Sequence, residues 1–446
     1  MQDDWKITPR LSLSLGVRYD REILPDVFAN LVNPAVPQTS HMPSDGNNVG
    51  PRVGFAFDVF GTGKTVLRGG YGLYYARVIN STVFSALTST GVAGAQTSVT
   101  FTPSTANAPA FPVVFPANAS PAGKSVTYFD PHFQLPQIRQ ADLTLEHDIG
   151  WGTVISASYL GAFGRQLPDF VDQNLNPSTT NLTYTVLPGG PLAASTLTVP
   201  LFTGARPNPA FGAMTDIFSG VTSNYQALSL QANHRLSHHV QINANYTWSH
   251  ALDDGVNGTT FTATNSLFNP FNIKQDYANS IYNVPNRFVV NAILTSPWHF
   301  TGFSKWLAND WQLAPVFQIQ NGLPISVGTS GNAPGGTVSG INGSGGANRI
   351  LSRDSIQMPN TWVSDMRVSK SFAFNERYKL ELLTDFFNLA NKQNITGVNT
   401  TGYIISGTTA ATATLTPNAP FNTPTSSNSN FIYSPRQIQL GARFHF

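Results

Sequence analysis

The chain has 446 residues and a formal net charge of +2, with 11% charged residues, 11% aromatic residues and no cysteine. A soluble domain carries about 25% charged residues, so this composition argues against a protein that is surrounded by water on all sides. The nearly neutral charge argues against nucleic acid as a partner, and the lack of cysteine excludes disulfide scaffolds, thiol catalysis and cysteine-ligated zinc.

Alternation of apolar and polar residues with a period of two starts near the N-terminus and recurs along the chain. Residues 11–19 place Leu, Val and Tyr on one face and Ser, Gly and Arg on the other. Residues 52–59 and 67–75 repeat the pattern on both sides of a short turn, as do residues 228–236 and 240–248. Each pair predicts a β-hairpin with one apolar and one polar face.

The same pattern predicts further strands, and residues 1–7 resemble the end of an earlier strand. The further strands are residues 140–147, 153–161, 287–295, 311–320, 363–372, 378–387 and 436–446. The total is about a dozen strands of roughly 9–11 residues, the length that crosses a bilayer at a tilt. No run approaches the roughly 18 apolar residues that a membrane helix needs.

The connections alternate in length, which predicts that all the long ones emerge on one side. Short turns follow residues 7, 59, 147, 236 and 372, and a longer turn follows residue 295. Long loops rich in Gly, Pro, Ser, Thr and Asn occupy residues 20–51, 76–136, 162–224, 250–286, 321–361 and 388–435. The predicted fold is therefore an all-β transmembrane antiparallel β-barrel with long extracellular loops and short periplasmic turns.

Charged residues follow the same parity, because a charge on the lipid face costs about 2–4 kcal/mol at the bilayer midplane. His147, His234 and Lys370 have the apolar parity but lie near short-turn ends, where a side chain can snorkel to water. The residues predicted to face the lumen are Arg18, Arg68, Asp142, Glu146, Arg235, Asn243, Asn245, Arg287, Asp365, Arg367, Glu381, Asp385 and Arg443.

Aromatic residues of the apolar parity fall at two levels, which predicts the girdles found at both membrane interfaces. The short-turn level holds Trp5, Trp151, Trp311, Phe374 and Phe446. The long-loop level holds Tyr19, Tyr75, Tyr159 and Trp248.

No catalytic, cofactor or metal site is predicted, and the protein is not expected to be an enzyme. Residues 60–65 superficially resemble a phosphate-binding loop, but Asp58 stands where that loop needs glycine, so a hairpin turn is expected. His234, His238 and His239 flank one turn, and we interpret them as solvated residues rather than metal ligands. The inward carboxylates are expected to pair with inward arginines.

The last strand alternates up to a terminal aromatic residue, Phe446. It resembles the final-strand signal by which outer-membrane barrels are recognised for insertion, which implies the barrel-assembly machinery as a partner. Closing a barrel also gives the edge of such a strand a partner.

Several segments resemble TonB-dependent receptors, in particular their Oar-like group. They are residues 2–20, 51–57 (PRVGFAF), 68–75 (RGGYGLYY), 158–165 (SYLGAFGR), 245–250 (NYTWSH), 311–313 (WQL), 321–324 (NGLP), 386–391 (FFNLAN) and 441–446 (GARFHF). The resemblance implies an outer-membrane barrel of about 22 strands with a plugged lumen. Residues 1–446 would be its C-terminal part, without the signal peptide, the carboxypeptidase-regulatory-like domain, the TonB box and the plug.

The leading hypothesis is active, TonB-dependent uptake of a scarce bulky solute such as a siderophore or glycan. The expected partners are outer-membrane lipid, the TonB complex through the missing plug, and an unidentified solute. One alternative is a self-contained porin or enzyme barrel of about 12 strands, which would close on itself. Another is an extracellular β-rich binding protein, which would be freely soluble and would lack aromatic girdles.

Overall fold

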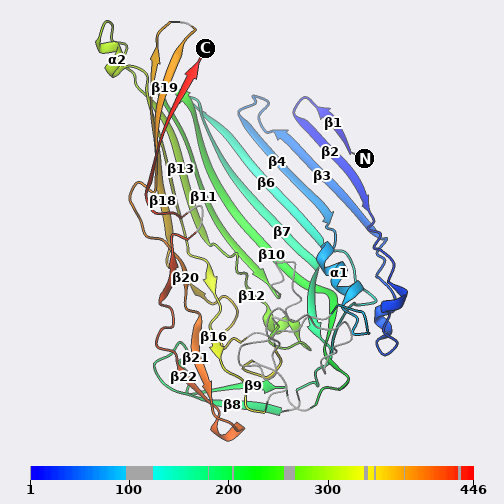
Figure 1. The fold of residues 1–446 in the computed structure, drawn as a ribbon. Coiled ribbons are helices and arrows are strands. Elements are labelled where there is room, and N and C mark those ends of the chain that lie inside the picture. The colour runs from blue at the N-terminus through cyan, green and yellow to red at the C-terminus, as the bar shows by residue number, and fades with distance from the viewer. Residues whose placement is uncertain are drawn as a thin grey trace.

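The computed structural model describes residues 2–96, 124–178, 180–202, 205–255, 267–335, 340–345, 348–375, 377–429 and 433–446. One large curved sheet dominates the fold, and its strands run side by side around a hollow (Figure 1). None of the described helices is both long enough and apolar enough to cross a membrane.

Thirteen strands follow one another along the sheet, and each is antiparallel to its neighbours. In order they are β1 (Gln2–Thr8), β2 (Leu11–Asp20), β3 (Asn48–Asp58), β4 (Thr65–Tyr75), β6 (Gln137–Gly150), β7 (Thr153–Asp172), β10 (Phe211–Ser237), β11 (Val240–Asp253), β13 (Asn286–Thr295), β14 (Trp311–Gln320), β18 (Thr361–Ala373), β19 (Lys379–Phe387) and β24 (Gln437–His445). Each strand predicted from the period-two pattern is present.

The predicted alternation of connections is confirmed. Tight turns join β1 to β2, β3 to β4, β6 to β7, β10 to β11 and β18 to β19 at one end of the sheet. The connection from β13 to β14 is longer and carries a short helix, α2 (Ser304–Ala308). The described parts of the long connections gather at the other end, where they form a layer below the strands (Figure 1).

The loop layer has more regular structure than the sequence predicted. It contains α1 (Asn80–Thr88) and β5 (Lys124–Phe129), and β5 pairs with β10. A five-stranded sheet joins distant segments: β16 (Gly328–Ser330), β21 (Thr401–Ser406), β22 (Thr414–Pro417), β8 (Thr180–Val186) and β9 (Thr196–Leu201). Shorter strands are β12 (Ala278–Asn279), β15 (Pro324–Ile325), β17 (Ile356–Gln357), β20 (Ile395–Val398) and β23 (Pro424–Ser427).

The predicted loop over residues 162–224 is wrong at both ends. β7 continues to Asp172 and β10 already begins at Phe211, so the two strands stay paired far into the loop layer. The register between the two strands shifts at residues 219–223 of β10, next to Ser219, which pairs with Pro168 of β7. Proline lacks an amide hydrogen and disturbs the hydrogen-bond ladder. For this reason the sequence did not predict that β7 continues past residue 161.

The buried apolar clusters lie in the loop layer and not on the large sheet. One cluster is built on the five-stranded sheet around Tyr184, Tyr403 and Leu415, and a second surrounds α1 and Phe129. In contrast, the apolar rows of the sheet are exposed, including Leu15, Val53, Leu143, Leu230 and Leu440. The rows therefore do not converge on a dry centre, and only an apolar surrounding medium can cover them.

Candidate functional site: the polar face of the sheet and its mouth

The strand register gathers the polar residues of the sheet on one face. Residues directly opposite each other in a ladder share a face, so pairs such as Arg367 with Asp385 and Glu381 with Arg443 link one strand to the next. Following these pairs from β2 to β24 places every residue predicted to face the lumen on this polar face, except Arg235. Arg235 follows a register shift, beyond the last regular pair of β10.

Ion pairs cross the polar face, as expected for carboxylates that lie among arginines. Arg367 donates to Asp385 from Nε at 2.6 Å and from Nη2 at 2.9 Å, which is a bidentate pair. Further pairs join Arg443 Nη1 to Glu381 Oε2 at 3.5 Å and Arg68 Nη2 to Glu146 Oε1 at 3.8 Å. Exposed pairs of this kind contribute about 0–1 kcal/mol each, so they shape the electrostatic field more than the stability.

Amides continue the polar face between the ion pairs. Asn245 Nδ2 donates to Ser229 Oγ at 2.8 Å, and Asn243 Nδ2 donates to the side chain of Asn233. Arg287 Nη2 donates to Gln318 Oε1 at 3.1 Å. Asp365 binds the backbone instead of an arginine, because its Oδ1 accepts the backbone amide of Asn388 at 2.7 Å.

Lys370 does not snorkel to water as the sequence suggested. Its side chain is buried, and Nζ donates to the backbone oxygen of Ser371 at 3.1 Å and to that of Asn309. His147 and His234 each pair through Nδ1 with a threonine hydroxyl, Thr65 and Thr153 respectively, at 2.8 Å.

In the described strands of the large sheet, three further charged residues have the apolar parity, which the sequence pattern did not predict. Arg139 lies opposite Leu73, Arg165 lies opposite Gln137, and Asp3 lies opposite Leu15. The two arginines belong to parts of β6 and β7 that extend past the predicted strands, at the long-loop end. If the predicted strands had included these extensions, the alternation would have placed both arginines on the apolar face.

The predicted girdle aromatics lie at several positions along the strands. Trp151 lies in the tight turn after β6, and Trp311, Phe374 and Phe446 also lie at the short-turn end. Tyr75 is partly buried against the α1 cluster. The remaining girdle residues are exposed: Trp5 lies in the middle of β1 and Tyr19 near the end of β2. Tyr159 and Trp248 lie within β7 and β11, which both continue past them, so the arrangement in two levels stays a prediction.

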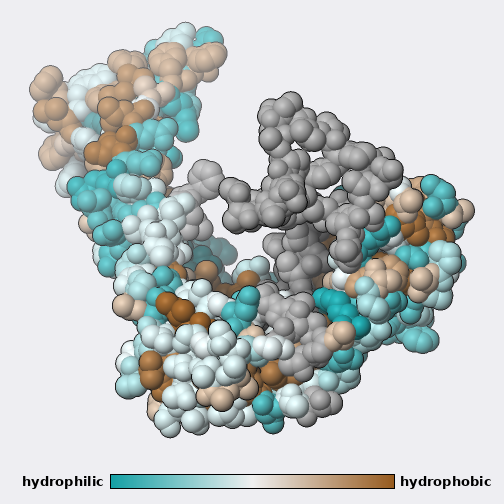
Figure 2. Space-filling view, turned by 60° about the horizontal axis from the view of Figure 1, so that its bottom comes forward, coloured by the Kyte–Doolittle hydropathy of each residue, from teal (hydrophilic) through white to brown (hydrophobic). Residues whose placement is uncertain are grey.

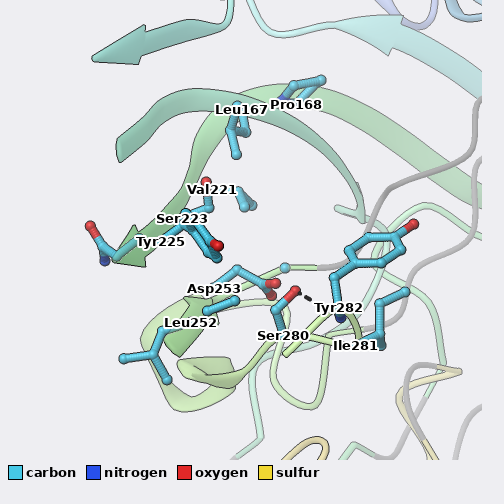
Figure 3. A pocket seen from close by; sticks show the side chains of 13 residues that line it. Leu167, Pro168, Val221, Ser223, Tyr225, Leu252, Asp253, Ser280, Ile281 and Tyr282 are labelled. Atoms are coloured by element: carbon cyan, nitrogen blue, oxygen red, sulfur yellow. Dashed lines mark hydrogen bonds between the residues drawn. The ribbon is translucent and has the colours of Figure 1, made fainter. Parts of the chain in front are cut away.

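A pocket opens where the polar face meets the loop layer (Figure 3). Its volume is about 410 Å³, and it lies between the extensions of β7 and β10, the end of β11 and the segment that follows β12. Leu167, Val221, Tyr225 and Tyr282 give it an apolar and aromatic wall, to which Asp253 adds a carboxylate. Sequence analysis did not single out these residues, because four separate segments bring them together.

Buried ion pairs hold the loops beside this pocket. Arg353 Nη2 donates to Asp253 Oδ1, and Arg349 Nη2 donates to Asp276 Oδ1. Burial, followed by the nearby charge of Arg353, lowers the pKa of Arg349 to about 10. Burial also raises the pKa of Asp354, which accepts a hydrogen bond from Ser326 Oγ at 2.9 Å. Because Arg353 compensates Asp253, the pocket presents little net charge.

The glycine-rich segment at residues 60–65 forms the predicted turn. The turn after β3 is a hairpin, in which Asp58 accepts the amides of Gly61 at 2.9 Å and Gly63 at 2.8 Å. These amides are therefore occupied and do not face a phosphate. Within the described ranges, no group of three or more His, Asp or Glu residues could hold a metal ion.

The family model for the outer membrane beta barrel domain matches residues 1–439. The chain belongs to this family. The fold resembles that of the outer membrane transporter YddB from Escherichia coli, with a TM-score of 0.52 and 13% identity over 97% of this chain and 43% of that one. It also resembles a mutant ferric enterobactin receptor, PfeA, from Pseudomonas aeruginosa, with a TM-score of 0.50 and 10% identity over 100% and 44% of the two chains.

This outer membrane β-barrel chain thus spans less than half the length of either neighbour. A search of curated proteins gives no match. The family places the protein in the outer membrane, where lipid covers the exposed apolar rows. The two neighbours are a transporter and a receptor rather than enzymes. The outer-membrane β-barrel fold that the sequence predicts is confirmed.

Proposed function

We propose that the chain is the C-terminal part of the barrel of a TonB-dependent receptor that takes up a scarce, bulky solute. The observation that carries this proposal is the sorting of side chains: one face of thirteen strands is polar and charged, while the other exposes apolar rows. In Figure 2, hydrophobic residues gather on the outer side of the sheet's left part, and hydrophilic residues gather toward the hollow. The polar face would line the solute path, and the aromatic residues at its two ends would mark the interfaces.

The mouth pocket is the proposed capture site. Its wall of Leu167, Val221, Tyr225 and Tyr282 favours an apolar or aromatic part of the solute, and the paired Asp253 adds no free charge. From the pocket, the solute would pass along the arginines, carboxylates and amides of the polar face. A siderophore or a glycan with an apolar substituent fits this chemistry.

Further strands and partners complete the proposal. β1 and β24 lie at opposite ends of the sheet and do not pair with each other in the described part of the chain, which favours a larger barrel over one of about 12 strands that closes on itself. The TonB complex would act through a plug domain outside residues 1–446. Phe446 is exposed and would present the insertion signal to the barrel-assembly machinery.

The test is the TonB dependence of uptake. A labelled panel of a ferric siderophore, an oligosaccharide and a peptide is offered to cells that produce the protein, with and without TonB. We expect one solute class to accumulate only when TonB is present, and we expect Val221→Arg to lower that accumulation by filling the pocket with a charge. Accumulation without TonB, together with flux of the same solute through the purified chain in liposomes, would contradict the proposal and favour a porin.

A further inference from the structure

The connection between β13 and β14 exposes a group of large apolar side chains. Trp298, Phe300, Phe303 and Leu307 are 52%, 50%, 78% and 65% exposed. The other connections at this end are tight turns. Each Å² of apolar surface left in water forgoes about 25 cal/mol, so four such side chains in one short segment indicate a surface that something apolar covers.

This connection folds onto the outer, apolar face of the sheet. The Trp306 ring, from α2, stacks on Phe372 with ring centroids 6.0 Å apart, and lies 5.6 Å from the Phe374 ring. Phe372 pairs with Leu380 in the register and therefore belongs to the apolar face. Figure 1 shows α2 standing out from the sheet at the short-turn end, away from the hollow.

Hydrogen bonds fix the connection in this position. Asn309 and Phe300 exchange two bonds of 2.9 Å, and Trp311 Nε1 donates to the backbone oxygen of Leu307 at 2.7 Å. The buried Nζ of Lys370 donates to the backbone oxygen of Asn309 and lies 4.8 Å from the centre of the Phe372 ring. These hydrogen bonds fix the backbone that carries the exposed side chains.

We propose that residues 297–308 form a membrane foot, which inserts Trp298, Phe300, Phe303 and Leu307 into the phospholipid leaflet on the short-turn side. Phospholipid is the occupant because the foot continues the face that lipid already covers, and because Trp and Phe are favoured at the membrane interface. The exposed Lys305, whose Nζ lies 5.9 Å from the centre of the Trp306 ring, contacts the lipid phosphates. The foot sets the depth of this part of the wall, independently of any transported solute.

The absence of native cysteine allows single-site labelling without background. Phe303→Cys and Leu307→Cys are labelled with an environment-sensitive fluorophore in vesicles of phosphatidylethanolamine and phosphatidylglycerol. The matched control is Thr62→Cys, an exposed position in the tight turn after β3 at the same end of the sheet. We expect a lipid-borne quencher to quench positions 303 and 307 and aqueous iodide to quench position 62.

Two results would overturn the membrane foot. Iodide could quench positions 303 and 307 as strongly as position 62, which would place them in water. Alternatively, both positions could be shielded from both quenchers, which would mean that protein covers them.

The phosphate contact has its own test in the Phe303→Cys background. In phosphatidylglycerol vesicles, Lys305→Gln is expected to weaken lipid quenching of the label, and Lys305→Arg is expected to preserve it. Since Lys305 is exposed and supports no other described element, both variants keep the barrel fold, which resistance of the strands to protease verifies. Equal quenching in the Gln and Arg variants would refute the role of Lys305.

Discussion

A buried ion pair joins one of the long loops to the end of β11. Arg353 is largely buried and pairs with Asp253 at the end of β11, so its removal leaves a carboxylate uncompensated. We expect Arg353→Met to destabilise the loop layer by about 3–5 kcal/mol, while the membrane strands remain folded. Limited proteolysis checks this, with faster cleavage in the loop layer and unchanged protection of the strands.

The matched control is Arg18→Met at an exposed pair. Arg18 lies 2.7 Å from Asp20, and its side chain is 63% exposed, so water already screens the interaction. The expected change is below about 1 kcal/mol. Equal proteolysis of the two variants would mean that burial does not set the strength of these pairs.

Asp216 makes the stability of the loop layer depend on pH. It lies in the part of β10 inside the loop layer, and burial, followed by the negative charge of Asp130, raises its pKa from 3.8 to about 6. Its other charged or titratable neighbours are Asp172, which pairs with Arg206, and Tyr128. Among the described residues, Asp216 Oδ1 has no hydrogen-bond partner.

The direction of this pH dependence follows because the folded state binds the proton of Asp216 more tightly than the unfolded state does. Stability is highest below the unfolded pKa and falls as the pH rises through the window from about 4 to 6, by up to about 3 kcal/mol. Asp216→Asn should remove this dependence and should slow proteolysis of the loop layer at pH 7.5. A wild-type loop layer that resists protease equally at pH 4.5 and 7.5 would contradict this account.

Within a strand, the depth of a residue in the membrane and the face it lies on decide whether a charged substitution is tolerated. Leu230 has the apolar parity in β10, and Gln231 beside it has the polar parity. We expect Leu230→Arg to cost about 2–4 kcal/mol and to reduce assembly into the outer membrane, because it places a charge in hydrocarbon. Gln231→Arg should assemble normally, since it adds one more arginine to the polar face. Heat-modifiable migration on gels distinguishes the assembled fraction of each variant.

The strands in the membrane could be predicted because lipid and water impose opposite demands on alternate residues. That contrast ends in the loop layer, where both faces of a strand can pack against protein. Residues 211–223 show no clear alternation, so the sequence predicts a loop where the structure has the first half of β10. Residues 182–186 do alternate, with Leu182, Tyr184 and Val186 buried, and this signal could have revealed β8.

The long-range contacts of the loop layer could not be predicted from the sequence. β22 pairs with β8 through Leu415 and Val186, although more than two hundred residues separate them. No local pattern specifies such a partner. For the same reason, the mouth pocket could not be predicted, whereas the polar face that leads to it could be named residue by residue.

At the scale of the whole molecule, the apolar surface lies outside and the packed cores lie in the loops at one end. This distribution is the reverse of that in an ordinary globular protein. It arises because one face of the sheet contacts lipid and the other contacts water.

The most direct measurement is the reactivity of single cysteines placed along β10 and β11 with a water-soluble maleimide in intact outer membranes. We predict that Gln231→Cys and Asn245→Cys react rapidly, while Leu230→Cys and Tyr246→Cys are protected by lipid. Equal reactivity on both parities, or protection of positions 231 and 245 with free reaction at 230 and 246, would contradict the assignment of the two faces and the solute path that depends on it.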